Sequence, residues 1–180
     1  MEGKNRVVRE TERRSGKSTV TVTMAVLTAV YAIIMIYLMF FRSRGGFDGS
    51  FAEYAEYHVK LIPFETTMHY LRRLAAGTIN PKIAVTNVFG NIVMFIPLGV
   101  IIPFFMKNAR RWYKTALSSA TVMLAVETAQ LISMRGTFDV DDIILNTLGA
   151  VIGYVVFTVG NRTAERMKQE GGCSGGKRTL

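Results

Sequence analysis

Residues 19–41 read TVTVTMAVLTAVYAIIMIYLMFF, a run without a single charged side chain. An α-helix rises about 1.5 Å per residue, so this run is long enough to cross the ~30 Å hydrocarbon layer of a bilayer. Gly45 and Gly46 follow it and should end the helix. The stretch therefore predicts a membrane-spanning helix. The basic segment before it and the apolar run itself are both longer than in a cleaved signal peptide, so we expect a retained anchor.

Further along the chain, more apolar runs of spanning length cover residues 83–105, 114–134 and 142–160. In the first of these, Pro97 and Pro103 should make the second half kinked or irregular. We therefore expect an all-α integral membrane bundle with four transmembrane helices. The bundle would cover residues 19–160, between a basic tail (residues 1–18), disordered or lying on the surface, and a flexible polar tail (residues 161–180).

The connection over residues 42–82 is too polar to span a membrane but has a helical pattern. It carries two sets of side chains at helical spacing, separated by Pro63: Tyr54, Tyr57, His58 and Leu61, then Phe64, Met68 and Leu71. Such segments favour one or two amphipathic helices at the membrane interface, where tyrosine is stable. A metal site on His58 and His69 with the aspartates is an alternative to ordinary interfacial histidines.

The charge distribution predicts the orientation. The chain carries a net charge of +9 although 49% of its residues are hydrophobic. Its basic residues flank the apolar runs and build no single basic face, so the bilayer is the expected partner and nucleic acid is not. With four spans, 15 basic residues fall on the side of the termini and 7 on the other. The positive-inside rule therefore predicts a multi-pass cell-membrane protein with both termini in the cytoplasm. Cys173 is alone, which excludes an internal disulfide.

Polar side chains recur within the spans, where they are costly unless paired. Under the predicted topology each lies toward the outer end of its helix. Asp142, Asn146, Gly149 and Gly153 follow a single helical stripe, and the small residues of that stripe allow another helix to approach closely. The polar groups above them should then face the bundle interior. The candidate site residues are Asn87, Asn91, Glu127, Gln130, Arg135, Asp139, Asp141, Asp142 and Asn146.

Two of these groups have both a structural and a functional interpretation. In the loop before the fourth span, one aspartate, Asp139 or Asp141, should cap the following helix, and Arg135 could pair with an aspartate. Glu127 lies deeper. It could hydrogen-bond to an amide of Asn87, Asn91 or Gln130, or it could handle a ligand, a proton or a cation.

At these same residues the chain resembles the VanZ-like family of membrane proteins, over residues 61–154. The matching segments are LIPF at 61–64, Asn87-x-x-Gly90-Asn91-x-x-x-Phe95-x-Pro97-Leu98-Gly99, Glu127-x-x-Gln130, and Arg135 followed by Phe138-Asp139-x-Asp141-Asp142-x-x-x-Asn146-x-x-Gly149. Where family members often carry asparagine before LIPF, this chain has Lys60. The resemblance implies a protein of a Gram-positive-type cell envelope, and the family's namesake is associated with low-level resistance to the lipoglycopeptide teicoplanin.

We therefore expect a protein that recognises an amphiphile at the outer leaflet through the nine candidate residues. The ligand would be a lipid-linked cell-wall intermediate or a lipoglycopeptide. Arg135, with Arg72 and Arg73 nearby, could contact phosphate or carboxylate, and the acidic loop could bind amines or hold a divalent cation. No other cofactor is expected, and the oligomeric state is left open.

Two other functions fit the same residues. Paired carboxylates could act as general acid and base or bind a metal, which would make the protein an enzyme that acts on a lipid phosphate or a cell-wall lipid, although no catalytic residue can be assigned. The chain could also be a structural or partner-binding subunit, in which case the polar groups should form a closed hydrogen-bond network with no cavity open outward.

Overall fold

The computed structural model describes residues 2–41 and 47–173. Within these residues four helices are long and apolar enough to cross a membrane: Ser18–Phe41, Pro81–Phe105, Trp112–Ile132 and Val140–Met167. This confirms the predicted all-α architecture with four transmembrane helices. The predicted helix end at Gly45 and Gly46 and the last part of the polar tail, residues 174–180, lie outside the described residues.

The N-terminal helix forms a compact unit of its own, separate from the rest of the chain. Helix α1 covers Glu2–Ile36 and continues as a short π-helix, η1, over Tyr37–Phe41. The backbone is therefore already helical where we predicted a disordered or surface-lying tail. Glutamate, arginine and lysine, which dominate this segment, are good helix formers, and no proline interrupts it. Apolar side chains of its span such as Ile33 and Ile36 are exposed, as suits contact with lipid.

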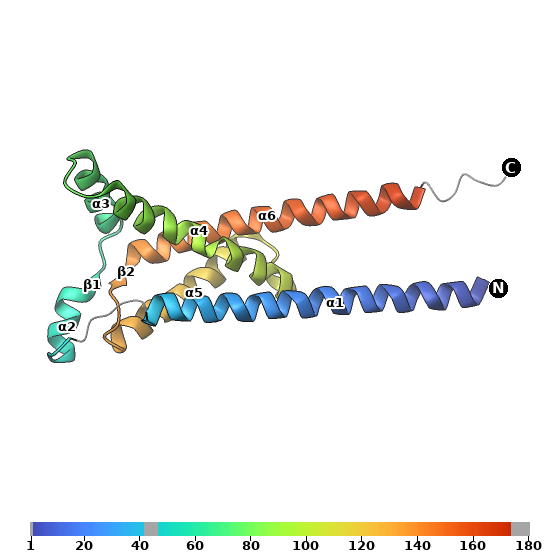
Figure 1. Cartoon of the computed structure of the whole chain (residues 1–180), viewed down its shortest axis with the longest axis horizontal. Coiled ribbons are helices and arrows are strands. Elements are labelled where there is room, and N and C mark those ends of the chain that lie inside the picture. Colours follow the sequence, from blue (N-terminus) through green and yellow to red (C-terminus); the bar gives the residue numbers. More distant parts are fainter. Residues whose placement is uncertain (1, 42–46, 174–180) are drawn as a thin grey trace. The chain divides into compact units, whose positions relative to one another are not determined.

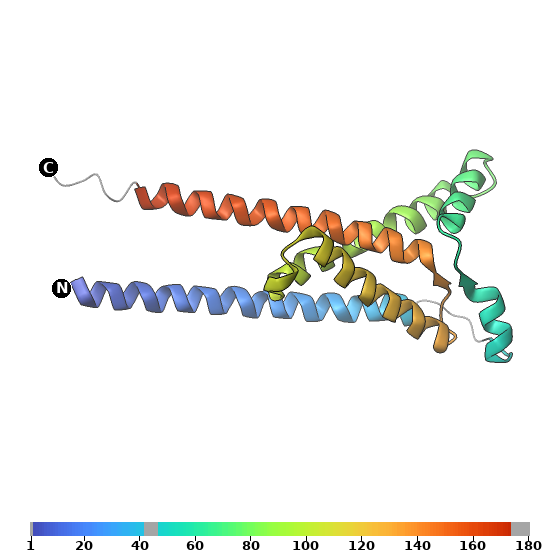
Figure 2. The ribbon, with the colours of Figure 1, turned by 180° about the vertical axis from the view of Figure 1, so that it is seen from behind.

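The second unit is built on α4 (Pro81–Phe105), α5 (Trp112–Ile132) and α6 (Val140–Cys173). Helix α6 packs most extensively against α4 and also against α5 (Figure 1). A turn containing the 3₁₀-helix η2 (Lys107–Ala109) joins α4 to α5 at the opposite end from α3 (Figure 2). Helix α4 remains α-helical as far as Phe105, past Pro97 and Pro103, so of the kinked or irregular second half that the prolines suggested, the irregular form is not found in this helix.

The contact between α4 and α6 depends on glycine. A Cβ on Gly149 would lie 2.1 Å from the carbonyl oxygen of Ile92, and one on Gly153 would lie 2.0 Å from that of Ile96. On the other helix, a Cβ on Gly99 would lie 1.9 Å from the carbonyl oxygen of Ala150. The two backbones are therefore in direct contact, which small residues permit. This confirms that the Gly149–Gly153 stripe faces protein.

The connection before α4 folds into two short helices, as its periodicity predicts. They are α2 (Phe51–His58) and α3 (Glu65–Ala75), and between them the strand β1 (Val59–Lys60) pairs in parallel with β2 (Phe138–Asp139), which precedes α6. Helix α2 begins with a capping box in which Ser50 and Glu53 exchange hydrogen bonds.

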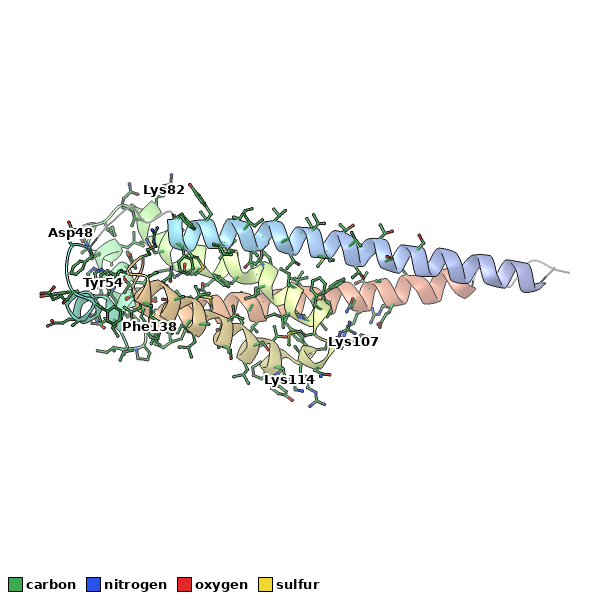
Figure 3. All side chains as sticks on the ribbon, turned by 90° about the horizontal axis from the view of Figure 1, so that it is seen from below. Asp48, Tyr54, Lys82, Lys107, Lys114 and Phe138 are labelled. Carbon is green, nitrogen blue, oxygen red and sulfur yellow. The ribbon has the colours of Figure 1, made fainter. Side chains whose placement is uncertain are left out.

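We call the end of the second unit where α4 and α6 begin and α5 ends the acidic end. Tyr54, Lys82 and Phe138 lie there, whereas Lys107 and Lys114 mark the opposite end (Figure 3).

Candidate functional site

The aspartate at the start of α6 acts first as a helix cap. Asp139 precedes α6 directly, and its Oδ1 accepts a hydrogen bond of 2.9 Å from the backbone N–H of Asp141. A side-chain oxygen that accepts from the second residue of the helix is the usual N-cap arrangement. Of the two aspartates that the sequence proposed for this role, Asp139 is the one that caps.

The second oxygen of Asp139 contacts the connection between α2 and α4. Its Oδ2 accepts a hydrogen bond of 2.7 Å from the Thr66 hydroxyl and lies 3.9 Å from Nζ of Lys60. The strand pairing explains the second contact, because Lys60 stands directly opposite Asp139 in the β1–β2 register. Lys60, which the sequence marked only as a departure from the family's usual residue, is therefore an ion-pair partner.

Asp141 caps a different helix from its own. Helix α3 begins after Phe64, which has a left-handed backbone (φ 65°) and provides no side-chain cap. The carboxylate of Asp141 accepts hydrogen bonds from the backbone N–H groups of Phe64 and Thr67, the latter at 2.7 Å. Asp141 is buried, and a carboxylate at a helix N-terminus is stabilising. It thus fixes the start of α3 to the start of α6.

The other two acids connect α6 to the remaining helices of the bundle. Asp142 accepts a hydrogen bond from the side-chain amide of Asn91 in α4. Glu127, on α5, is only 1% exposed, and its Oε2 accepts a hydrogen bond of 3.2 Å from the backbone N–H of Asp139. One partner of Glu127 is therefore a backbone group, which was not among the partners that the sequence analysis proposed. We call Asn91, Glu127, Asp139, Asp141 and Asp142 the acidic cluster.

Asn146 lies one turn further into the bundle than Asp142. It is 2% exposed, and its amide nitrogen lies 3.6 Å from the sulfur of Met123 on α5. Within the described residues its side-chain oxygen has no hydrogen-bond partner. A half-satisfied buried amide destabilises the fold, so packing alone does not account for an asparagine here.

For the remaining candidate residues the structure gives other contacts or surface positions. Asn87 is exposed and donates a hydrogen bond of 2.8 Å to the carbonyl oxygen of Ile83, one turn earlier in α4. Gln130 packs against Gly136, and Arg135 is exposed in the loop after α5. The structure therefore brings together five of the nine predicted residues and places Asn146 one turn below them.

Helix α2 is joined to the same end of the bundle by a tyrosine hydrogen bond. The hydroxyl of Tyr54 donates a hydrogen bond of 2.9 Å to the carbonyl oxygen of Gly136. The ring of His58 stacks on that of Tyr54, with centroids 3.8 Å apart, and its Nδ1 lies 2.8 Å from the Tyr54 carbonyl oxygen.

In residues 2–41 and 47–173, no group of three or more His, Cys, Asp or Glu side chains is placed to hold a metal ion. The divalent cation suggested at the acidic loop stays a prediction.

A pocket of about 450 Å³ opens beside the acidic cluster, between β1, α3 and the start of α4. Its walls are formed by Lys60, Glu65, Thr66, His69, Tyr70, Arg73, Ile79 and Ile83. None of the nine candidate residues lines this α3 pocket, but two of its wall residues, Lys60 and Thr66, contact Asp139. Arg73, which we expected nearby, lines it, whereas Arg72 does not.

The helical spacing of α3 contained a signal for this pocket that the sequence analysis did not use. Five of the wall residues recur at intervals of one helical turn or less, and all are polar: Glu65, Thr66, His69, Tyr70 and Arg73. The opposite face carries Met68 and Leu71, which are exposed and apolar. Such a helix lies naturally at a membrane interface, with its apolar face toward lipid.

Together, the four spans and the interfacial segment held by the acidic cluster define a multi-pass helical membrane protein. The sequence model of the VanZ/LLP1 family matches residues 28–161, so the chain belongs to this family. A curated relative, Protein VanZ of Enterococcus faecium, is 24% identical over 142 residues, which cover 79% of this chain and 78% of the relative. No solved structure matches the chain.

Proposed function

We propose that this protein binds an amphiphilic molecule of the cell envelope at its acidic end and thereby lowers susceptibility to teicoplanin-type lipoglycopeptides. In this proposal both termini lie in the cytoplasm and the acidic end faces outward, as the distribution of basic residues predicts. The ligand places its polar head in the α3 pocket. The observation that carries the proposal is this pocket, which lies between an interfacial helix and the first turns of a membrane span.

The size of the pocket favours one of the two predicted ligand classes. Its volume of about 450 Å³ falls within the ~300–1,000 Å³ that is usual for sites that enclose small molecules. The head of a lipid-linked cell-wall intermediate has parts of that size, whereas a lipoglycopeptide is several times larger and could insert only a fragment. We therefore favour the lipid-linked intermediate as the occupant.

In this proposal the acidic cluster has a supporting role. Asp139 and Asp141 direct their carboxylates at Thr66 and at the backbone of Phe64 and Thr67, all at the start of α3. Those hydrogen bonds fix the helix that forms one wall of the pocket. The signature acids would then determine ligand binding by positioning α3, without contacting the ligand themselves.

A bulky side chain in the pocket tests the proposal. We expect expression of the wild-type protein to raise the inhibitory concentration of teicoplanin in a susceptible host. Ile79→Trp should abolish this effect, because the indole ring would fill the space that the polar head of the ligand needs. Ile62→Trp is the matched control, since Ile62 lies on the same connection but is exposed and does not line the pocket. Membrane abundance of both variants is measured by immunoblot. Full activity of Ile79→Trp, or no effect of the wild type, would contradict the proposal.

A further inference from the structure

We infer that the α3 pocket binds a phosphate-bearing lipid headgroup, and that Lys60 and Arg73 are the cations that contact it. The inference rests on the proposed function, because it names the chemistry of the ligand at the same pocket. It goes beyond that function by assigning specific contacts to residues that lie outside the acidic cluster.

Lys60 is held in place through its backbone while its charge remains accessible. Its position in β1 is fixed by pairing with Asp139 in β2. The ammonium lies 3.9 Å from the Asp139 carboxylate, and 43% of the lysine side chain is exposed. An ammonium has three N–H donors, and a single contact at that distance leaves donors for a ligand. Asp139 therefore orients Lys60 at the start of α3 and leaves N–H donors of the ammonium available to a ligand.

Arg73 enters the pocket from the other end of α3, about two turns after Thr66. The guanidinium makes one long hydrogen bond, 3.4 Å from Nη2 to the carbonyl oxygen of Thr78. Its five N–H donors form a planar fork that matches the oxygens of a phosphate. Lys60 and Arg73 both line this pocket of about 450 Å³, so their long side chains can both reach one diphosphate.

Glu65 provides the opposing charge within the same pocket. It lies in the first turn of α3, two turns before Arg73. One carboxylate against two cations leaves the described wall with an excess of one positive charge, and the carboxylate should weaken phosphate binding by repulsion. Removal of the Glu65 charge is therefore expected to tighten binding, a result opposite in sign to removal of either cation.

The apolar wall indicates that the phosphate belongs to a lipid. Ile79 and Ile83 complete the pocket, and Ile83 is an exposed residue in the first turn of the membrane span α4. On the face of α3 opposite the pocket, Met68 and Leu71 are also exposed. A headgroup bound in the pocket would thus have its hydrocarbon chain at the lipid boundary. There the chain would contact apolar side chains, and a free phosphate could make no such contact.

The inference can be tested on the purified full chain in detergent. Binding of farnesyl diphosphate is followed by ³¹P NMR, with farnesol and inorganic diphosphate as the competing probes. We expect Lys60→Gln and Arg73→Gln each to weaken binding about tenfold, since each removes a charge-assisted hydrogen-bond donor. Arg72→Gln, the matched control from the adjacent exposed position outside the pocket, should change binding by less than about twofold because exposed charges interact weakly. Glu65→Gln should strengthen it.

Several outcomes would overturn the inference. Equal losses of affinity in Arg72→Gln and Arg73→Gln would show that the ligand is attracted only by the net charge of the protein. Competition by farnesol would show that the prenyl chain binds without its diphosphate. Inorganic diphosphate that binds as tightly as farnesyl diphosphate would overturn the assignment to a lipid. This test is separable from that of the proposed function. If phosphate binding fails while Ile79→Trp abolishes resistance, the pocket acts on another headgroup; if binding holds while Ile79→Trp is silent, only the role in resistance fails.

Discussion

Helices α4 and α6 are joined in two places, at a glycine interface and at the acidic cluster, and the two contacts work by opposite means. In the interior of the bundle, Gly99, Gly149 and Gly153 bring two backbones into direct contact, and there the absence of a side chain is what matters. At the acidic end the contacts are made by carboxylates: Asp139 and Asp141 reach the start of α3, and Asp142 reaches α4. The comparison suggests that the glycines set the close approach of α4 and α6, and that Asp139 and Asp141 hold the start of α3 on the bundle.

The largest effect is expected at the glycine interface. Gly149→Ala places a methyl group 2.1 Å from the Ile92 carbonyl oxygen, a rigid backbone atom, so α4 and α6 must separate. We expect the free energy of unfolding to fall by about 3 kcal/mol or more, at the upper end of the usual cost of overpacking. Thermal unfolding of the purified full chain in detergent measures the change.

Gly90→Ala is the matched control for this substitution, because Gly90 lies on α4, the helix that carries Ile92, but among the described residues only the Thr86 methyl group, at 3.7 Å, lies near a new Cβ. Alanine favours helix over glycine by up to about 1 kcal/mol, so this variant should be neutral or slightly more stable. Equal destabilisation by both alanines would show that helix packing in this region is not decided at the Gly149 contact.

A smaller effect is expected where an amide meets an acid. Asn91→Ala removes the hydrogen bond to Asp142 and leaves a half-buried carboxylate without that donor, at a cost of about 1.5 kcal/mol, as for hydrogen bonds to charged groups. Asn87→Ala, one turn earlier, removes only an exposed bond within α4 and should cost less than about 0.5 kcal/mol. Both are measured by thermal unfolding. Equal thermal stability of the two variants would show that the hydrogen bond between Asn91 and Asp142 does not stabilise the fold.

The sequence predicted those features that depend on local pattern. Apolar length located the four spans, spacing located α2 and α3, and the Gly149–Gly153 stripe indicated the buried face of α6. Convergence of Asn91, Glu127 and the three aspartates also followed, because their helices reach the same end of the bundle.

Other features were beyond the sequence because they depend on long-range register. The two-residue pairing of β1 with β2 has no periodic signal, yet it decides that Lys60 lies beside Asp139. In the same way, the cap on α3 comes from Asp141, 74 residues after Thr67, so no local capping motif reveals it. The polar spacing of α3 marked one wall of the α3 pocket, but the position of Lys60 in the same pocket depends on this strand pairing.

Amide hydrogen exchange tests most directly whether the acidic cluster positions α3. The exchange rates of peptides from α3 and from α4–α6 are compared between the wild type and Asp141→Ala. The substitution leaves the N–H groups of Phe64 and Thr67 without their acceptor, so we expect exchange in α3 to accelerate about tenfold while the α4–α6 interface around Gly149 is unchanged. Unchanged exchange in α3, or equal acceleration across the whole bundle, would contradict the account.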